Sequence, residues 1–210
     1  MSSPDPGSVI AANFSSPIDA IYLAAIFDPI FTISYPNTRK VQRTGPPKNA
    51  KLVEIKNILD SNPGQIIAVF PECGTTNGKA ILPFSPSILQ TPADVHIFAV
   101  SIRYTPSDIT TPVPGKWSRF LWDLLSRPTT CIRMRIAEGQ MNTSAAKTNG
   151  VTPSSSELRN RSDANSGVSP DEQRVLDRIG EALARLSRVK RVGLTMKDKA
   201  AFVDALHGKK

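Results

Sequence analysis

Residues 66–79 read IIAVFPECGTTNGK, an apolar strand followed at once by a carboxylate, hydroxyl side chains and two glycines. In open α/β sheets, ligands bind beyond the carboxyl ends of the strands. Gly74 and Gly78 allow a tight loop whose backbone N–H groups can face an anion, and Lys79 can add positive charge. An ordinary turn at the end of a strand has the same composition. The residues alone therefore leave a ligand-binding loop and a plain turn both open.

Short apolar runs alternate with helical patterns on both sides of this stretch. The predicted strands are residues 8–12, 30–34, 65–70, 95–104 and 131–137. The first predicted helix begins at Ser16 and has an apolar face of Ile18, Tyr22, Leu23 and Ile26. Two further helices are predicted at residues 52–59 and 117–125. The segment 35–48 is expected to be a Pro-rich, basic connection. Strands separated by helices predict an α/β fold, a mostly parallel sheet with flanking helices, plus a C-terminal helical tail.

The apolar pattern divides the chain into an α/β domain at residues 8–138, a flexible linker at 139–169 and basic C-terminal helices at 170–210. The linker is rich in Ser, Thr, Asn and Ala and nearly lacks large apolar residues. Residues 169–172 form a capping box, with proline at the first helical position. A second helix is expected to begin at Thr195 and to bury Phe202, Val203 and Leu206.

The composition excludes several classes of protein. The chain has 210 residues, of which 40% are hydrophobic, and this share excludes wholesale disorder. Two cysteines and two histidines can form neither a disulfide framework nor a zinc cluster. The longest apolar stretch, residues 18–33, is too short and too interrupted to cross a bilayer, so we expect no transmembrane segment. The formal charge of +8 leaves nucleic acid, an anionic membrane surface or a phosphate-bearing substrate open as partners.

The C-terminal region carries a run of basic side chains that can bind anionic lipid head groups or nucleic acid: Arg185, Arg188, Lys190, Arg191, Lys197 and Lys199. A solvated helix face has the same pattern. Aromatic side chains interleaved with the basic ones would favour nucleic acid, and only Phe202 is nearby. We therefore expect a membrane surface and no nucleic acid as the partner. His96, inside an apolar run, is expected to be a core or edge residue, and Cys73 has no histidine partner in sequence.

The residues quoted above, with Leu82-Pro83-Phe84 after them, resemble the Phe-Pro-Glu-Gly-Thr block of the PlsC-type glycerolipid acyltransferases, which include the lysophosphatidic acid acyltransferases. Residues 97–104 are similar to the strand that follows in that family. Residues 13–19, NFSSPID, stand where the family has Asn-His-x-x-x-x-Asp. The resemblance covers residues 8–138 and is strongest to a fungal branch that is also linked to vacuolar protein sorting.

The resemblance implies an enzyme that transfers a fatty acyl group from acyl-CoA, as co-substrate, to a lysophospholipid such as lysophosphatidic acid. No bound cofactor or metal is implied. It further implies membrane association, at the endoplasmic reticulum or the lipid droplet surface. Its substrate-binding candidates in this sequence are Arg43, Glu72, Gly74, Thr75 and Lys79, and Glu72, Gly74 and Thr75 would bind the acceptor phosphate.

The chain departs from the family pattern at the catalytic position. The family histidine takes the proton from the acceptor hydroxyl, and the aspartate of its motif orients the imidazole ring. Here Phe14 stands at the position of the histidine, and a phenyl ring cannot take a proton. Asp19 is the remaining catalytic candidate, although capping a helix gives it a sufficient structural role. A weak or inactive relative that still binds lipid, or a basic module that binds membranes or partners, are therefore alternatives.

Three further departures concern the substrate site and the length. Glu72 is followed by Cys-Gly-Thr and not by Gly-Thr-Arg, so the phosphate contact must come from Lys79 or from backbone N–H groups. Arg43 is the candidate for the arginine of a middle block that is shorter than in the family. The hydrophobic anchor that usually precedes the Asn-His block is not expected in the twelve residues before Asn13. A shortened or alternatively spliced chain would explain both differences.

Overall fold

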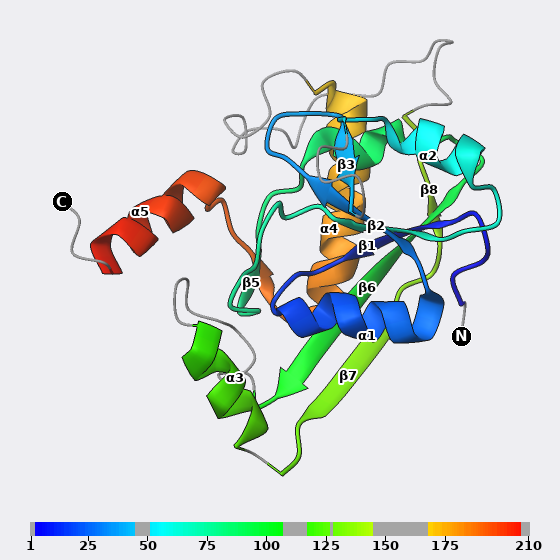
Figure 1. The fold of residues 1–210 in the computed structure, drawn as a ribbon. Coiled ribbons are helices and arrows are strands. Elements are labelled where there is room, and N and C mark those ends of the chain that lie inside the picture. Colours follow the sequence, from blue (N-terminus) through cyan, green and yellow to red (C-terminus); the bar gives the residue numbers. More distant parts are fainter. Residues whose placement is uncertain (1–2, 45–50, 107–116, 127, 145–167, 207–210) are drawn as a thin grey trace.

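The computed structural model describes residues 3–44, 51–106, 117–126, 128–144 and 168–206 (Figure 1). Four parallel strands form the centre of its main sheet, in the order β2 (Ile30–Ser34), β4 (Ile67–Phe70), β1 (Val9–Ala12) and β6 (His96–Thr105). Strand β3 (Val41–Arg43) pairs antiparallel with β2 at one edge, and β7 (Cys131–Ile136) and β8 (Gln140–Met141) pair antiparallel with β6 at the other. The predicted α/β fold with a mostly parallel sheet is confirmed.

Helices cover both faces of this sheet, as its buried parallel strands require. Val9 and Ala11 pack on one side with the buried residues of α2 (Ile55–Ser61), the 3₁₀ helix η1 (Pro86–Gln90) and α4 (Pro170–Ser187). Ile10 and Ala12 face the opposite way and pack near α1 (Pro17–Phe27), whose Leu23 is fully buried. Figure 1 shows α1 and α4 on opposite sides of the strands. Alternate residues of β1 thus belong to two separate cores.

The capping box predicted at residues 169–172 is present, and residues 16–19 form a second one. The Ser16 hydroxyl caps α1, and the carboxylate of Asp19 accepts from the backbone N–H of Ser16. At the start of α4, Ser169 and Glu172 make the same reciprocal pair of hydrogen bonds. Each box satisfies backbone donors that a helix leaves without a partner in its first turn. The predicted starts of these two helices are therefore confirmed.

Helix α4 belongs to the same core as the sheet. Val175, Leu176, Ile179 and Leu183 are each at most 2% exposed and pack with residues of β1, β4 and β6. A bidentate ion pair joins Glu172 to Arg39, with an N–O distance of 2.6 Å for its shorter contact. The helix that follows residue 169 is thus part of the structure that holds the sheet.

Several expectations about individual segments were wrong. The connection at 35–48 contains strand β3, and the expected linker contains strand β8, after which Asn142 is fully buried. The side-chain amide of Asn142 donates to two backbone carbonyls at 2.8 Å, which fixes this segment on η1. Residues 145–167 of that linker lie outside the described residues. Ile26, on the predicted apolar face, and Phe202, expected to be buried, are 44% and 64% exposed. The helix predicted at 52–59 begins later, at Ile55, and Leu52 is 47% exposed.

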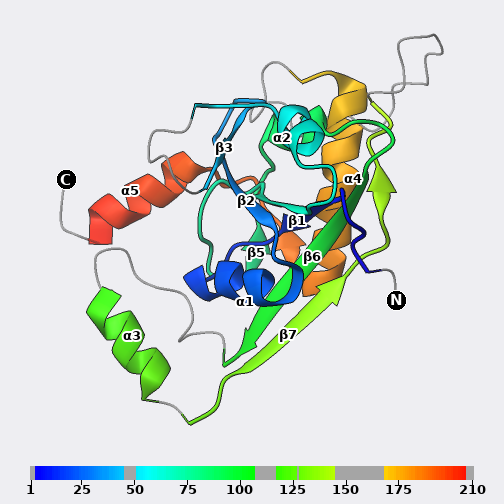
Figure 2. The same cartoon turned by 45° about the vertical axis from the view of Figure 1, so that its right-hand side comes forward.

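A small second sheet brings the C-terminal region to the loop that follows β4. Strand β5 (Ala80–Ile81) pairs in parallel with β9 (Lys190–Arg191), and α5 (Met196–Leu206) follows. Figures 1 and 2 show α5 and α3 (Trp117–Leu125) on the same side of the molecule, away from α4. None of the helices in the described ranges is long and apolar enough to span a bilayer.

Candidate active site

The carboxyl ends of β1, β4 and β6 lie side by side, because these three parallel strands are neighbours in the sheet. Val69 of β4 and Ala99 of β6 both pair with Ala11 of β1. The 13–19 block follows β1, the loop 72–79 follows β4, and residues 103–105 form the end of β6. The sequence motifs of the first two segments are therefore brought together at one edge of the sheet.

Asn13 fixes the first segment to the end of β6. Its Oδ1 accepts from the N–H of Ile102 at 2.7 Å, and its Nδ2 donates to the carbonyl of the same residue at 3.0 Å. The N–H of Thr76 donates to the carbonyl of Phe14 at 2.7 Å, which joins the loop 72–79 to the same segment. Hydrogen bonds between buried groups such as these hold the three chain segments in one arrangement.

Asp19 lies beneath this edge and is fully buried. Its Oδ2 accepts from the N–H groups of Ser15 and Ser16 at 2.7 and 2.8 Å, and the Tyr104 hydroxyl donates to its Oδ1 at 2.5 Å. Burial raises the pKa of Asp19 to about 6, although its hydrogen bonds to Tyr104, Ser16 and Ser15 oppose the shift. The capping role is confirmed, and a catalytic role stays a prediction. Both carboxylate oxygens are occupied within the fold.

Phe14 takes the place of the family histidine at this edge. Its ring is half-buried and stacks on Phe70, with 4.5 Å between the ring centroids. Of the residues that the structure describes, His96 is the one histidine, and it lies at the opposite, amino-terminal end of β6. There its ring is 6.2 Å from that of Phe98. No imidazole of the described residues therefore reaches the 13–19 block.

Glu72 follows β4 directly and is only 1% exposed. Its Oε2 accepts from the N–H of Leu82 at 3.0 Å. Burial raises the pKa of Glu72 to about 7, and the nearby charge of Asp19 raises it further, while the backbone amides of Leu82 and Phe14 oppose the shift. A carboxyl group with this pKa changes its charge near neutral pH.

This pKa predicts a specific pH dependence of stability. An acid whose pKa is higher in the folded than in the unfolded state stabilises the fold below its unfolded pKa, and this stabilisation is lost as the pH rises through the folded pKa. Glu72→Gln removes the titration. The unfolding free energy of Glu72→Gln, relative to that of wild type, should therefore rise by on the order of 3 kcal/mol between about pH 4.5 and about pH 8. Urea unfolding of both proteins across that range measures the difference, and parallel curves would contradict it.

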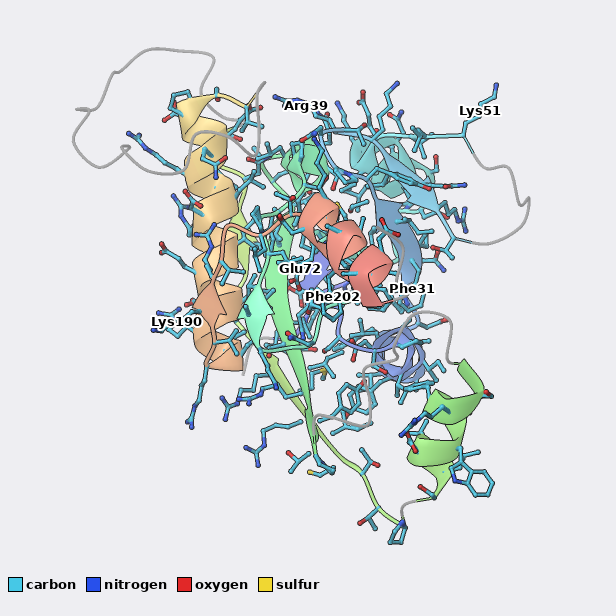
Figure 3. All side chains as sticks on the ribbon, turned by 90° about the vertical axis from the view of Figure 1, so that its left-hand side faces the viewer. Phe31, Arg39, Lys51, Glu72, Lys190 and Phe202 are labelled. Carbon is cyan, nitrogen blue, oxygen red and sulfur yellow. The ribbon has the colours of Figure 1, made fainter. Side chains whose placement is uncertain are left out.

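The middle of the loop is covered by α5. Lys199 Nζ donates to the carbonyl of Thr75 at 2.6 Å and lies 3.0 Å from its hydroxyl oxygen. Gly74 lies under Met196, and a Cβ at Gly74 would come 2.5 Å from the Met196 Cε. Figure 3 shows α5 in front of this part of the sheet, with Glu72 beside it. A side chain at position 74 would therefore displace Met196.

Cys73 stands where the acyltransferase family that this sequence resembles has a glycine after the glutamate. Its φ of 61° lies in the left-handed region that favours glycine. Burial raises the pKa of the Cys73 thiol to about 11, so the thiol is protonated at neutral pH. Because the thiolate is the nucleophilic form, Cys73 is poorly suited to attack a thioester.

Two pockets flank the loop. One, of about 270 Å³, is lined by Glu72 and Cys73, by residues 82–85 and by residues 194–197 at the start of α5. The other, of about 230 Å³, contains hydroxyl and amide groups of Asn13, Ser15 and Thr76 together with two cations, Lys79 and Arg103. The second pocket therefore combines hydrogen-bond donors with positive charge, which is the chemistry that binds a phosphate.

The predicted site residues are distributed unequally around these pockets. Glu72 lines the first and Lys79 the second, while Gly74 and Thr75 lie in the loop between them. Arg43 is exposed at the end of edge strand β3 and lines neither pocket. Arg103, Tyr104 and Lys199 were not among the candidates. In the sequence, Arg103 and Tyr104 are marked as the polar end of an apolar strand. Lys199 is marked only by its place in a basic run.

The chain is thus an α/β protein with two polar pockets at the carboxyl edge of its sheet. It is 27% identical, over 215 residues, to a protein from Schizosaccharomyces pombe that carries the provisional name lysophosphatidic acid:oleoyl-CoA acyltransferase. The alignment covers 95% of this chain and 63% of that relative. No family model and no solved structure matches the chain. The similarity to the relative supports the expected relation to acyltransferases.

Proposed function

We propose that this chain is an acyltransferase domain that moves a fatty acyl group from acyl-CoA to a lysophospholipid, and that lysophosphatidic acid is the acceptor. The observation that carries the proposal is the cationic pocket of Asn13, Lys79 and Arg103 next to the 13–19 block. The name that the relative carries supports the same donor and acceptor. Membership of the branch linked to vacuolar sorting stays a prediction.

The charge around the second pocket supports a phosphate-bearing acceptor. Neither Lys79 nor Arg103 forms an ion pair with another described residue. Arg103 of β6 also lies directly opposite Arg133 of β7, and both side chains are exposed. Like charges at facing positions of two strands destabilise the sheet unless an anion binds between or beside them. A phosphate monoester would relieve this repulsion.

The reaction needs a base that this site lacks in its usual form. The acceptor hydroxyl oxygen attacks the thioester carbonyl, a new C–O bond forms, and the C–S bond to CoA breaks. The hydroxyl proton goes to a base, and the leaving thiolate takes up a proton. With Phe14 at the histidine position, water or a carboxylate must accept the first proton. General base catalysis contributes roughly 10²–10⁴ in rate, so we propose a slow enzyme.

Exposed apolar side chains support action at a membrane face. Leu121, Trp122 and Leu125 of α3 are 51%, 75% and 79% exposed, and Phe202 of α5 is 64% exposed. Both helices lie on the same side of the molecule in Figures 1 and 2. Apolar side chains on a charged helix insert into the head-group region of a bilayer. The endoplasmic reticulum and the lipid droplet surface stay predictions as the membrane concerned.

Removing the pocket charges should weaken the use of the acceptor and not of the donor. We expect Lys79→Gln/Arg103→Gln to raise the KM for lysophosphatidic acid by roughly a hundredfold or more, because hydrogen bonds to charged groups contribute about 1.5–3 kcal/mol each and the variant removes two such groups. The KM for oleoyl-CoA should stay within about twofold. The assay follows labelled oleoyl-CoA on vesicles that contain lysophosphatidic acid.

Lys51→Gln/Lys56→Gln is the matched control, since it removes two exposed lysines at the other side of the molecule, where Figure 3 labels Lys51. It should leave both KM values unchanged. An equal rise in the KM for lysophosphatidic acid in both double variants would attribute the effect to the charge of the whole protein and contradict a phosphate site in the second pocket.

A further inference from the structure

Lys199 is a half-buried ammonium group that has lost part of its hydration. Desolvation by burial lowers the pKa of Lys199 from its usual value. The group uses two of its three N–H donors on Thr75, one at the carbonyl and one at the hydroxyl. The third donor has no partner among the described residues. One N–H group of the Lys199 ammonium therefore remains available to a ligand.

In the part of the chain that the structure describes, no carboxylate forms an ion pair with Lys199. Among the described residues, the ion pairs of the C-terminal region are those of Asp171 with Arg174, Asp177 with Arg191 and Glu172 with Arg39. Asp198, next to Lys199 in sequence, accepts from the backbone N–H and hydroxyl of Thr195. A partly buried charge without a counter-ion is unfavourable, and an anionic ligand would remove the penalty.

The chain path fixes Lys199 at the loop between the two pockets. Strand β9 pairs with β5 directly after the loop, and the N–H of Val192 donates to the carbonyl of Ile81 at 3.0 Å. The first turn of α5 then packs on Gly74 through Met196. The position of Lys199 is therefore a consequence of a defined strand pairing and not of a free tail.

We propose that Lys199 binds the phosphate of the acceptor at the Thr75 segment and adds a second cation to Lys79, the lysine of the loop 72–79. This inference rests on the proposed function and adds a residue from the C-terminal helix to its acceptor site. The ligand chemistry is a phosphate monoester, and inorganic phosphate shares it. Lys199 then links the docking of α5 to the binding of the acceptor.

The test measures the dissociation constant of lysophosphatidic acid for the full chain and for Lys199→Gln and Lys199→Arg. The glutamine amide can still donate to the Thr75 carbonyl and so keeps α5 docked, but it has no charge. We expect Lys199→Gln to bind roughly ten- to a hundredfold more weakly. Lys199→Arg, which keeps the charge, should stay within about threefold of wild type.

Three further arms define what the side chain recognises. Monoacylglycerol, which lacks the phosphate, should bind equally to wild type and to Lys199→Gln. Inorganic phosphate should compete with lysophosphatidic acid for binding to wild type, and much less for binding to Lys199→Gln. If wild type binds inorganic phosphate but does not bind lysophosphatidic acid, the site is one for free phosphate and the inference about the acceptor is overturned. Lys56 is an exposed lysine on α2, and the control variant Lys56→Gln should bind lysophosphatidic acid as wild type does.

Unchanged binding of lysophosphatidic acid by Lys199→Gln would overturn the inference and leave Lys199 as a tether of α5. Tighter binding would also overturn it, because α5 would then cover the site. Weaker binding of lysophosphatidic acid by Lys199→Gln, together with no acyl transfer by wild type or by either variant, would support Lys199 as a phosphate contact. The same result would contradict the proposed enzymatic function. The two proposals therefore fail in different ways.

Discussion

Replacing Phe14 by histidine is expected to raise the rate of acyl transfer by about 10²–10⁴. The reason is that the variant restores an imidazole at the end of β1, five residues before Asp19 and beside the cationic pocket. The effect should appear in kcat, since the acceptor and donor contacts are unchanged. Initial rates with labelled oleoyl-CoA and lysophosphatidic acid, at saturating donor, measure it.

The new imidazole meets one competitor. The hydroxyl of Tyr104 donates to the Asp19 oxygen Oδ1, which leaves no free carboxylate oxygen to orient the ring. Adding Tyr104→Phe removes this donor. The double variant Phe14→His/Tyr104→Phe should therefore be faster than Phe14→His alone, whereas Tyr104→Phe alone should stay slow.

Phe31→His is the matched control for the introduction of an imidazole. Phe31 is also half-buried and stacks on Phe70, with 6.3 Å between the ring centroids, but it lies on β2. This variant should keep the wild-type rate. A gain of the same size in Phe31→His, or no gain in Phe14→His despite a folded protein, would contradict the assignment of the 13–19 block as the catalytic position.

The second large effect is expected for Asp19→Ala, which should lower the unfolding free energy by about 3–5 kcal/mol near pH 5. The change leaves the buried N–H groups of Ser15 and Ser16 and the hydroxyl of Tyr104 without their acceptor, and it removes the capping box. Domains of this size are stable by about 5–15 kcal/mol, so the loss is a large share. Urea unfolding measures it.

The pH dependence of this loss has a definite sign. The pKa of Asp19 is raised to about 6, so its stabilising contribution is present below its unfolded pKa and is lost as the pH rises through about 6. The deficit of Asp19→Ala should therefore shrink by on the order of 1 kcal/mol between about pH 5 and about pH 8. Asp19→Asn keeps one acceptor oxygen and should lose much less. Equal losses in both variants would refute the hydrogen-bond account.

Features set by neighbouring residues could be predicted from the sequence. The Ser-Pro starts of α1 and α4 each place a capping residue, a proline and an acidic side chain within four positions, and both boxes are present. The apolar run of β4 needs no distant partner to be identified as a strand. Local patterns therefore predicted the parallel α/β fold and the position of the loop that follows β4.

Features that depend on distant pairing could not be predicted. Strand β3 has three residues with one buried side chain, and only its pairing with β2 makes it a strand. The hydrogen bond from Tyr104 to Asp19 joins residues 85 positions apart, and Lys199 reaches Thr75 across 124 positions. Without the register of β5 with β9, nothing in the basic run distinguishes Lys199 from its neighbours.

The same limit applies to the exposed aromatic residue of α5. Its spacing with Val203 suggested a buried face, but α5 contacts the loop through Met196 and Lys199 and leaves Phe202 exposed. A helix pattern predicts which residues share a side and not which side is covered. The covered side of α5 is the one that reaches the candidate acceptor site.

We propose that this chain transfers an acyl group to lysophosphatidic acid at the edge formed by β1, β4 and β6. A single-turnover reaction with excess protein, labelled oleoyl-CoA and vesicles containing lysophosphatidic acid tests it most directly, with the product identified by mass spectrometry. We predict that wild type forms labelled phosphatidic acid slowly and that Phe14→His forms the same product about 10²–10⁴ times faster. The absence of phosphatidic acid from both reactions, with both proteins folded, would contradict the claim.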